Sequence, residues 1–327
     1  MSLQDFPSIL RYGARGTGLW EGLMQGAAGL LCETAEGPPR PWQRQPCGRC
    51  PGCTLLRSGS HPDLRLLLPA ALAGELGQRA AGSGGEAPPD GRAASRGTVG
   101  REIAIDQVRE LIDWAQATSH RGGLKVALVH PLDAMAAPAA NALLKLLEEP
   151  PAGLCLLAGS HRLDRVLPTL RSRCLLQPWG RPDAARALDE LRRRGTEQPE
   201  AVAAWCRNAV FDSDPARGLQ WTRRLVEQMA AGQAPQGDGV APAVAVESLQ
   251  KLSFDLLRCR AGLPALYLQG LDDSLRRLGG QGDAGAWQQW WRRLAQAAAT
   301  ADFPLHAGLA VQAWIVEWTH LCTSRAK

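Results

Sequence analysis

The sequence predicts an α/β domain with a parallel sheet, followed by a region built of helices alone. Apolar strand-like runs alternate with helix-like stretches up to about residue 178, a pattern that favours a parallel sheet with crossover helices. A glycine-rich turn separates the first strand-like run from the first helix-like stretch. From residue 181 onward every apolar pattern has helical spacing. We therefore expect a domain boundary near residue 178.

The strand-like runs are short and strongly apolar. They cover residues 8–12, 64–68, 125–130, 154–160 and 173–177. Two of the intervening helical patterns span residues 103–118 and 131–149. Asp106 is the expected N-cap of the first. Pro138 suits the first turn of the second helix, and the Pro-Pro pair that begins at Pro150 ends it.

Two segments have the composition of linkers. Residues 73–101 are rich in Gly, Ala, Ser, Pro and Arg and lack apolar periodicity, so we expect a linker or disordered loop there. Residues 231–243 form a second break, rich in Gly and Pro, which lies either within or between helical domains.

The last expected helix, about residues 305–322, carries two apolar stripes. One comprises Trp314, Trp318 and Leu321, and the other comprises Leu309, Ala313 and Val316. An apolar surface of this width implies burial on two sides. Either a central place in the protein's own bundle or a partner subunit would provide it.

The composition is that of a globular protein. The chain has 327 residues, 45% hydrophobic and 21% charged, with a net charge of +5, which only weakly suggests a polyanionic partner. It contains no apolar run long enough to cross a membrane and no secretory leader pattern at its start. We therefore expect a cytoplasmic protein. Five of the nine cysteines lie singly among apolar neighbours, where we expect small buried side chains: Cys155, Cys174, Cys206, Cys259 and Cys322.

The glycine-rich turn from Gly13 through Gly16 to Gly18 fits the first part of a phosphate-binding loop, G-x-x-x-x-G, between a strand and a helix. The next two positions of such a loop are Lys and Ser or Thr. The Lys neutralises the nucleotide phosphates, and the hydroxyl holds Mg²⁺. Here these positions are Leu19 and Trp20. We therefore expect that the chain neither binds nor hydrolyses ATP.

A second catalytic element is also missing. The strand at 125–130 ends in His130, where an active ATPase of this type would carry an acidic pair for Mg²⁺ and for the attacking water. Asp133 follows shortly afterwards, and we interpret it as a helix N-cap rather than as a metal ligand.

Four cysteines are clustered near the start of the chain. Cys47, Cys50 and Cys53 form two consecutive C-x-x-C steps, and Cys32 lies upstream. Four thiolates suit tetrahedral Zn²⁺ and leave no open coordination position, so we expect a structural zinc ion. An iron–sulfur cluster or a redox motif is the alternative.

Several segments together resemble the delta-prime subunits of the bacterial DNA polymerase III clamp loader. They are the cysteine cluster, His61-Pro62-Asp63, Gly122-Gly123-Leu124-Lys125-Val126, the run from Asn141 to Pro151, and Ser172-Arg173-Cys174. The resemblance implies an AAA+ parallel-sheet domain of the P-loop type over residues 1–178, with a zinc module inserted at 32–53. It also implies a helical lid at 179–222 and an all-α collar at 223–327 that builds the oligomer.

The same resemblance implies the role of individual residues. Arg173 corresponds to an arginine that reaches into the ATP site of a neighbouring gamma/tau subunit as an arginine finger. The implied partners are the delta and gamma/tau subunits, and the sliding clamp and primer–template DNA through the complex, within the DNA-directed DNA polymerase holoenzyme. The family has a longer lead before its first strand, with an early helix, so here either the start of the sequence is misassigned or that helix is missing. If the helix is missing, we expect one side of the domain to be less well covered.

Two other interpretations stay open. One is a self-sufficient AAA+ ATPase, against which Leu19, Trp20 and His130 speak. The other is a zinc-dependent nucleic-acid-binding protein, in which the lid arginines Arg192, Arg193 and Arg194 would approach phosphates rather than form a solvated helix face.

Overall fold

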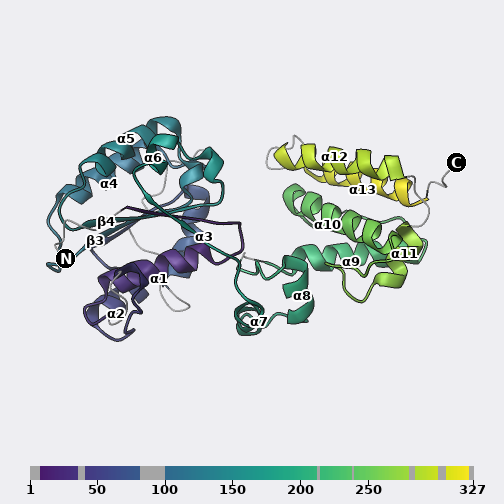
Figure 1. Cartoon of the computed structure of the whole chain (residues 1–327), viewed down its shortest axis with the longest axis horizontal. Coiled ribbons are helices and arrows are strands. Elements are labelled where there is room, and N and C mark those ends of the chain that lie inside the picture. Colours follow the sequence, from purple (N-terminus) through teal and green to yellow (C-terminus); the bar gives the residue numbers. More distant parts are fainter. Residues whose placement is uncertain are drawn as a thin grey trace. The chain divides into compact units, whose positions relative to one another are not determined.

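The computed structural model describes residues 8–35, 41–81, 100–211, 214–237, 239–279, 284–300 and 307–323. The chain divides into two compact units, residues 1–181 and 182–327. Figure 1 traces the elements of both units along the chain. Among the described helices, none combines the length and apolar character needed to cross a membrane.

The first unit is built on a five-stranded parallel sheet, as the sequence predicts. Its strands are β1 (Ile9–Tyr12), β2 (Leu64–Leu67), β3 (Lys125–Val129), β4 (Leu154–Ser160) and β5 (Leu175–Pro178), in the order β2-β3-β4-β1-β5. Strand β1 is central, pairing with β4 and β5. The last strand begins two residues later than expected, so Arg173 and Cys174 lie in the turn before it.

Helices cover both faces of this sheet (Figure 1). One core cluster joins the sheet to α4 (Ile105–Gln116), α5 (Ala137–Glu148) and α6 (Pro168–Arg171). The cluster on the opposite face includes residues of α1 (Leu19–Leu31), α2 (Pro51–Arg57) and α3 (Ala70–Ala81). Three single-turn 3-10 helices complete the unit: η1 (Pro41–Gln43), η2 (Leu132–Ala134) and η3 (Leu163–Arg165). This layering is the AAA+ arrangement that the sequence resemblance implies.

The structure corrects two expected helix caps. Asp106 lies inside the first turn of α4, and the N-cap is Ala104. The Ala104 N–H donates to Oε1 of Gln107 at 2.9 Å, so Gln107 does the capping that we assigned to Asp106. Asp133 lies in η2, and the N-cap of α5 is Ala136, whose side chain makes no capping bond. The contacts of Asp133 belong to the site described below.

The segment expected to be disordered is helical at its start. Helix α3 includes residues 73–81 of the expected loop. Leu76 is buried in the core cluster on that face of the sheet, with Leu72 partly buried beside it, and this anchorage accounts for the helix. Residues 82–99, the greater part of the expected loop, lie outside the described residues.

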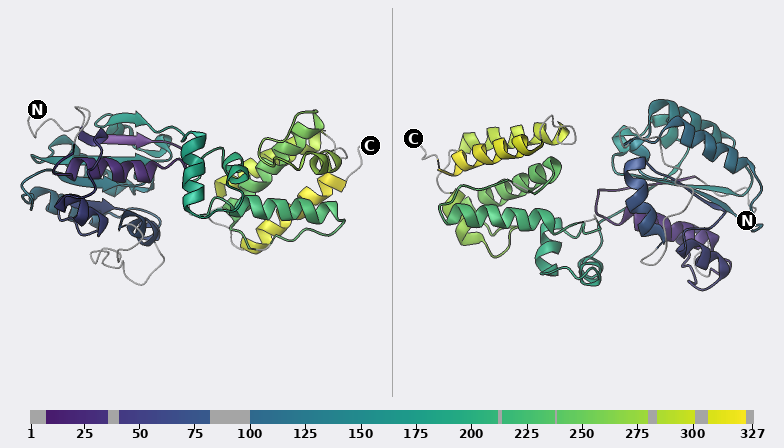
Figure 2. Two further views of the ribbon diagram at one scale, coloured as in Figure 1. Left: turned by 90° about the horizontal axis from the view of Figure 1, so that it is seen from below. Right: turned by 180° about the vertical axis from the view of Figure 1, so that it is seen from behind.

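The second unit is entirely helical where it is described, and Figure 2 shows its helices from two further directions. They are α7 (Ala184–Arg193), α8 (Pro199–Cys206), α9 (Arg217–Ala230), α10 (Pro242–Arg260), α11 (Asp272–Gly279), α12 (Ala284–Thr300) and α13 (Ala307–Thr323). A single core cluster extends from α7 to α13. Residue 222, where we expect the lid to end, lies within α9, and the lid–collar boundary stays a prediction.

The two apolar stripes of helix α13 differ in burial. Trp318 is fully buried, and Trp314 and Leu321 pack partly buried against the same core. Leu309 is 70% exposed and Val316 is 45% exposed. The second stripe is therefore not covered by the described part of the unit.

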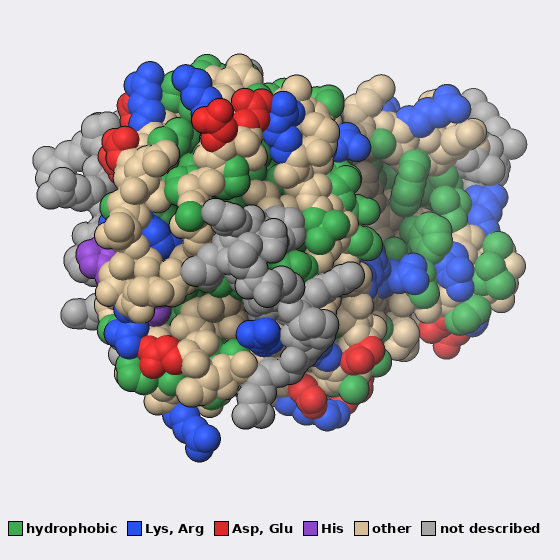
Figure 3. All heavy atoms as spheres, turned by 60° about the vertical axis from the view of Figure 1, so that its left-hand side comes forward, with side chains coloured by type: hydrophobic (Ala, Val, Ile, Leu, Met, Phe, Trp, Pro, Cys, Tyr) green, Lys and Arg blue, Asp and Glu red, His purple; other side chains and the backbone are tan. Residues whose placement is uncertain are grey.

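The surface carries charges of both signs. On the face shown in Figure 3, acidic and basic side chains are interspersed. The three lid arginines form ion pairs, Arg192 with Glu200 and both Arg193 and Arg194 with Glu190. These pairs favour the solvated helix face over a phosphate contact.

Candidate functional site: a filled nucleotide loop, a cysteine cluster and an ion-paired arginine

The loop after β1 is rich in glycine and leads directly into α1. Gly16 and Gly18 have φ values of 71° and 78°, in the left-handed region that favours glycine. Gly18 is the N-cap of α1. The Gly13 N–H donates to the carbonyl of Ser160 at 3.1 Å, which ties the loop to the end of β4.

The two positions that would bind phosphate and Mg²⁺ point into the protein instead. Leu19 and Trp20 are 2% and 5% exposed. The Trp20 ring lies 5.6 Å from the ring of His130, measured between centroids. His130 in turn meets His161 edge to face at 5.0 Å. Aromatic rings therefore pack below the loop, at the sheet edge where an ATPase of this type keeps its Mg²⁺ ligands.

Trp179 also packs against the loop and the start of α1. Its Nε1–H donates to the carbonyl of Thr17 at 3.1 Å, and its ring lies so close to Gly22 that a Cβ there would come within 2.3 Å of it. The Nδ1 atom of His161 lies 3.1 Å from the carbonyl oxygen of Gly13. Side chains that follow β4 and β5 thus bind loop carbonyls.

Asp133 binds two residues at the end of β4. Its Oδ1 accepts hydrogen bonds from the Ser160 hydroxyl and from the His161 N–H, both at 2.8 Å. The carboxylate thus positions His161 against the loop and does not cap a helix. Burial, reinforced by the nearby His161, lowers the pKa of His130 to about 3.

The four clustered cysteines converge as the sequence predicts. Their Sγ atoms all lie within 4.8 Å of one another. The Cys32 and Cys50 sulfurs are 3.8 Å apart, and those of Cys47 and Cys53 are 4.0 Å apart. Four sulfurs placed about 2.3 Å from a tetrahedral Zn²⁺ would be about 3.8 Å from each other. The described cluster can therefore hold a metal ion of this kind.

Backbone N–H groups surround the sulfurs. Cys32 Sγ accepts from the Cys47 N–H, Cys47 Sγ from the Cys50 N–H, and Cys50 Sγ from the Cys53 N–H, at 3.3 to 3.4 Å. A hydrogen bond from Thr34, together with backbone N–H donors, lowers the pKa of Cys47 to about 5. Burial, followed by a smaller contribution from the adjacent thiols, raises the pKa of Cys53 to about 12.

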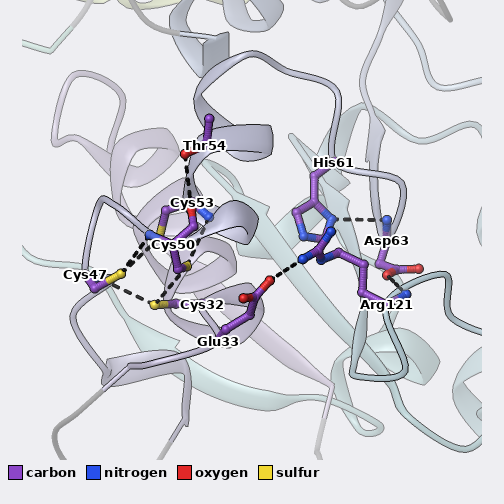
Figure 4. Close-up of polar contacts among 9 residues, drawn as sticks. All are labelled: Cys32, Glu33, Cys47, Cys50, Cys53, Thr54, His61, Asp63 and Arg121. Atoms are coloured by element: carbon purple, nitrogen blue, oxygen red, sulfur yellow. Dashed lines mark hydrogen bonds and ion pairs between the residues drawn. The ribbon is translucent and has the colours of Figure 1, made fainter.

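A polar network joins the cysteine cluster to the sheet (Figure 4). Glu33, next to Cys32, forms an ion pair with Arg121. The carboxylate of Asp63, which is 1% exposed, accepts the backbone N–H groups of His120 and Arg121 at 2.8 and 3.1 Å. The His61 ring accepts the Asp63 N–H. His61-Pro62-Asp63 therefore fixes the turn that follows α4 against the cluster, a role that the sequence did not reveal.

Arg173 is exposed and held in place. Its guanidinium pairs with Oε1 of Glu148, at the end of α5, at 2.7 Å and donates to the carbonyl of Thr169 at 3.1 Å. On the adjoining strand β5, Leu175 and Leu176 are 42% and 38% exposed. Strand β5 is the last in the sheet order, and Arg173 lies in the turn that precedes it.

Comparison with known proteins agrees with these features. The profile of the family described as "DNA polymerase III, delta subunit" matches residues 6–178. The chain is 37% identical over 196 residues to DNA polymerase III subunit delta' of Pseudomonas aeruginosa, covering 60% of this chain and 50% of that protein. It is 31% identical over 214 residues to the Escherichia coli subunit of the same name, covering 64% and 54%. The matches span about half the length of these relatives.

One solved structure aligns over almost the whole chain. It is a gamma subunit-related protein of DNA polymerase III from Thermotoga maritima, with a TM-score of 0.48, 14% identity and coverage of 98% of this chain and 97% of that one.

The parallel sheet, with helices on both faces, defines an AAA+ domain in which four cysteine sulfurs converge at the end of α1. The chain belongs to the DNA polymerase III delta subunit family, whose curated members similar to it are named delta'.

We predict that His130 makes the stability of the fold depend on pH. Its folded pKa of about 3 lies below the unfolded value of about 6.5, so the unfolded chain binds the proton first. Stability is therefore full above about pH 6.5 and falls as the pH drops towards 3. Between pH 7 and 5 the loss should be about 2 kcal/mol.

Urea unfolding at pH 7 and pH 5 measures this loss. His130→Leu should remove it, whereas His120→Leu, at an exposed position, should retain it. An equal pH dependence in wild type and His130→Leu would contradict the assignment.

Proposed function

We propose that this chain is a non-hydrolysing subunit of the DNA polymerase III clamp-loader complex, which helps to load the sliding clamp onto primed DNA. The observation that carries the proposal is the family match over residues 6–178. The relatives named delta' support the assignment to this position in the complex. Its partners would be the delta and gamma/tau subunits, with the clamp and primer–template DNA met through the complex in the cytoplasm.

The filled loop supports the absence of ATP hydrolysis. A nucleotide at Gly13 to Gly18 would find no Lys for its phosphates and no hydroxyl for Mg²⁺, since Leu19 and Trp20 occupy those positions and are buried. Admitting Mg²⁺ would also require displacing Trp20 from His130. The self-sufficient ATPase is therefore disfavoured.

We predict that the purified chain does not bind ATP·Mg²⁺ at concentrations up to about 1 mM, the upper range of ordinary substrate affinities. Isothermal titration calorimetry measures this directly, with an intact gamma/tau subunit as the positive control. Saturable binding in the micromolar range would favour the ATPase interpretation instead.

Arg173 is proposed to act on ATP bound by a neighbouring subunit. A guanidinium is a permanent cation with a planar array of donors that suits phosphate oxygens. Glu148 holds this one at an exposed edge, next to the apolar pair Leu175 and Leu176 that a partner would cover. The chain would thereby complete an active site that it does not contain.

We predict that Arg173→Ala leaves the complex assembled but lowers its DNA- and clamp-stimulated ATPase rate by about tenfold or more, because an arginine finger stabilises charge in the transition state. Arg173→Lys should recover only part of the rate, since Lys lacks the planar array. Arg165→Ala, an exposed arginine of η3, is the matched control. An unchanged rate for Arg173→Ala in the reconstituted complex would refute the finger.

The cysteine cluster is proposed to hold structural zinc. Cys32, Cys47, Cys50 and Cys53 fit it by donor type and by sulfur spacing. Bound there, zinc would supply a cross-link between the end of α1 and α2 and would complete no reaction, since four protein ligands leave no open position.

We predict one zinc ion per chain, measured by elemental analysis of protein purified without oxygen. Cys47→Ser should lower the content to well below half, whereas Cys206→Ser, outside the cluster, should not. Removal of the metal by a chelator should loosen residues 32–53 and increase their amide hydrogen exchange. Protein free of zinc, with the exchange of these residues unchanged, would exclude the assignment.

The helical unit is proposed to contain the lid and the collar. The exposed stripe of Leu309, Ala313 and Val316 on α13 supports a partner subunit as its cover. Membership of the complex can be tested by mixing the chain with the delta and gamma/tau subunits of the same organism and measuring the molar mass of the product. Failure to form a stable complex would refute the proposed function.

A further inference from the structure

A hollow of about 480 Å³ lies beside α1, between that helix, η1 and the ends of β1 and β5. We call it the Arg11 hollow. It differs from the filled nucleotide loop, with which it shares only the Trp179 side chain. Its polar lining consists of Arg11, Arg44 and the four glutamines Gln25, Gln43, Gln45 and Gln177. Among the described residues that line it, none is acidic.

Arg11 is a buried charge in a central strand. It follows Ile9 and Leu10, both fully buried, and is itself only 6% exposed. A buried ionised group is costly unless an opposite charge or enough hydrogen bonds compensate it. Burial lowers the pKa of Arg11, but a guanidinium remains protonated in proteins.

The described partners of Arg11 are all neutral. Its Nε donates to Oε1 of Gln177 at 3.3 Å, its Nη1 to the carbonyl of Gly22 at 2.5 Å, and its Nη2 to the carbonyl of Trp42 at 3.4 Å. The Trp179 ring lies 5.2 Å from the guanidinium carbon. A guanidinium has five N–H donors, so two of them have no acceptor in the described part of the chain.

A second observation points to a ligand. The hollow opens onto Arg11, so a group inside it would meet the charge that lacks an acidic partner. Trp42, which also lines the hollow, has a buried Nε1–H with no acceptor among the described residues. Glutamine amides can donate to a bound anion as well as accept from Arg11. The volume falls in the range of small-molecule sites, about 300–1,000 Å³.

We propose that the Arg11 hollow binds a small phosphate-class anion, either free phosphate or the phosphate group of a small metabolite, with the Arg11 guanidinium as its charge partner. A phosphate oxygen accepts from two N–H groups of one guanidinium and forms strong, charge-assisted bonds. The ligand would supply the opposite charge that the described residues do not place beside Arg11.

A glycine on α1 provides a test that keeps the fold. A Cβ at Gly26 would lie 3.4 Å from Nη1 and 3.6 Å from Nη2 of Arg11, so a methyl group there fits but covers the guanidinium. Alanine is also the better helix former. Gly26→Ala should therefore raise the melting temperature of the ligand-free chain and weaken anion binding.

The experiment titrates the full chain with inorganic phosphate, and separately with glycerol 3-phosphate, at constant ionic strength against chloride. Tryptophan fluorescence and melting temperature are the readouts, since Trp42 and Trp179 line the hollow. Wild type should respond saturably below about 10 mM of at least one probe, within the weaker range of ligand affinities. Which probe binds more tightly distinguishes free phosphate from a phosphorylated metabolite.

Gly26→Ala and Arg11→Gln should each weaken binding by about tenfold or more, and Arg109→Gln, an exposed arginine of α4, should leave it unchanged. Arg11→Gln removes a buried side chain and could unfold the unit. If it does, the anion affinity of Gly26→Ala tests the proposal. The proposal is overturned if wild type shows no saturable response to either probe, or if Gly26→Ala binds as wild type does.

Discussion

The carboxyl ends of parallel strands all lie at the same end of a sheet. The first residue after each strand there helps to form the surface that can bind a ligand. In this chain those residues are Gly13 after β1, Leu68 after β2, His130 after β3, His161 after β4 and Trp179 after β5. The three rings, with Trp20 from α1, pack against one another or bind the loop carbonyls. In the described part of the chain, aromatic side chains therefore occupy the carboxyl end of the sheet beside the loop after β1.

Much of this could be predicted from the sequence because the informative signals are local. Strand-like runs separated by helical periodicity gave the five parallel strands, and the spacing of Cys47, Cys50 and Cys53 gave a cluster whose sulfurs do meet. The interpretation of Leu19 and Trp20 as departures from a phosphate-binding loop stays a prediction, and the structure shows both side chains buried. The resemblance predicted the AAA+ architecture, whereas the order of the strands comes from the structure alone.

The missed features depend on contacts between distant segments. Asp133 looked like an N-cap because short polar residues before a helix usually are, but Ser160 and His161 bind its carboxylate from the next strand. Asp63 binds a turn almost 60 residues away. The packing of His161 and Trp179 on the loop could have been suspected, since His161 directly follows one predicted strand and Trp179 lies two residues beyond the end of another.

The polar network around Asp63 joins parts of the domain that lie far apart in the sequence. Glu33 and Arg121 link the cysteine cluster to the turn after α4, and Lys125 donates to the carbonyls of Trp114 and Ala117 at the end of the same helix. Lys125 thus adds contacts at the last turn of α4, where the Trp114 carbonyl also accepts the Ala117 N–H. The ion pair between Glu33 and Arg121 joins the segment next to the cysteine cluster to the turn after this helix.

The exposed edge strand has a consequence for the self-association of the chain. Strand β5 presents Leu175 and Leu176 together with a backbone edge that pairs with no other strand among the described residues. Edges of this kind favour pairing with other chains, and β5 is limited to four residues that end at a proline. In the isolated chain this strand can pair with a second copy, and its four-residue length and terminal proline limit such self-association.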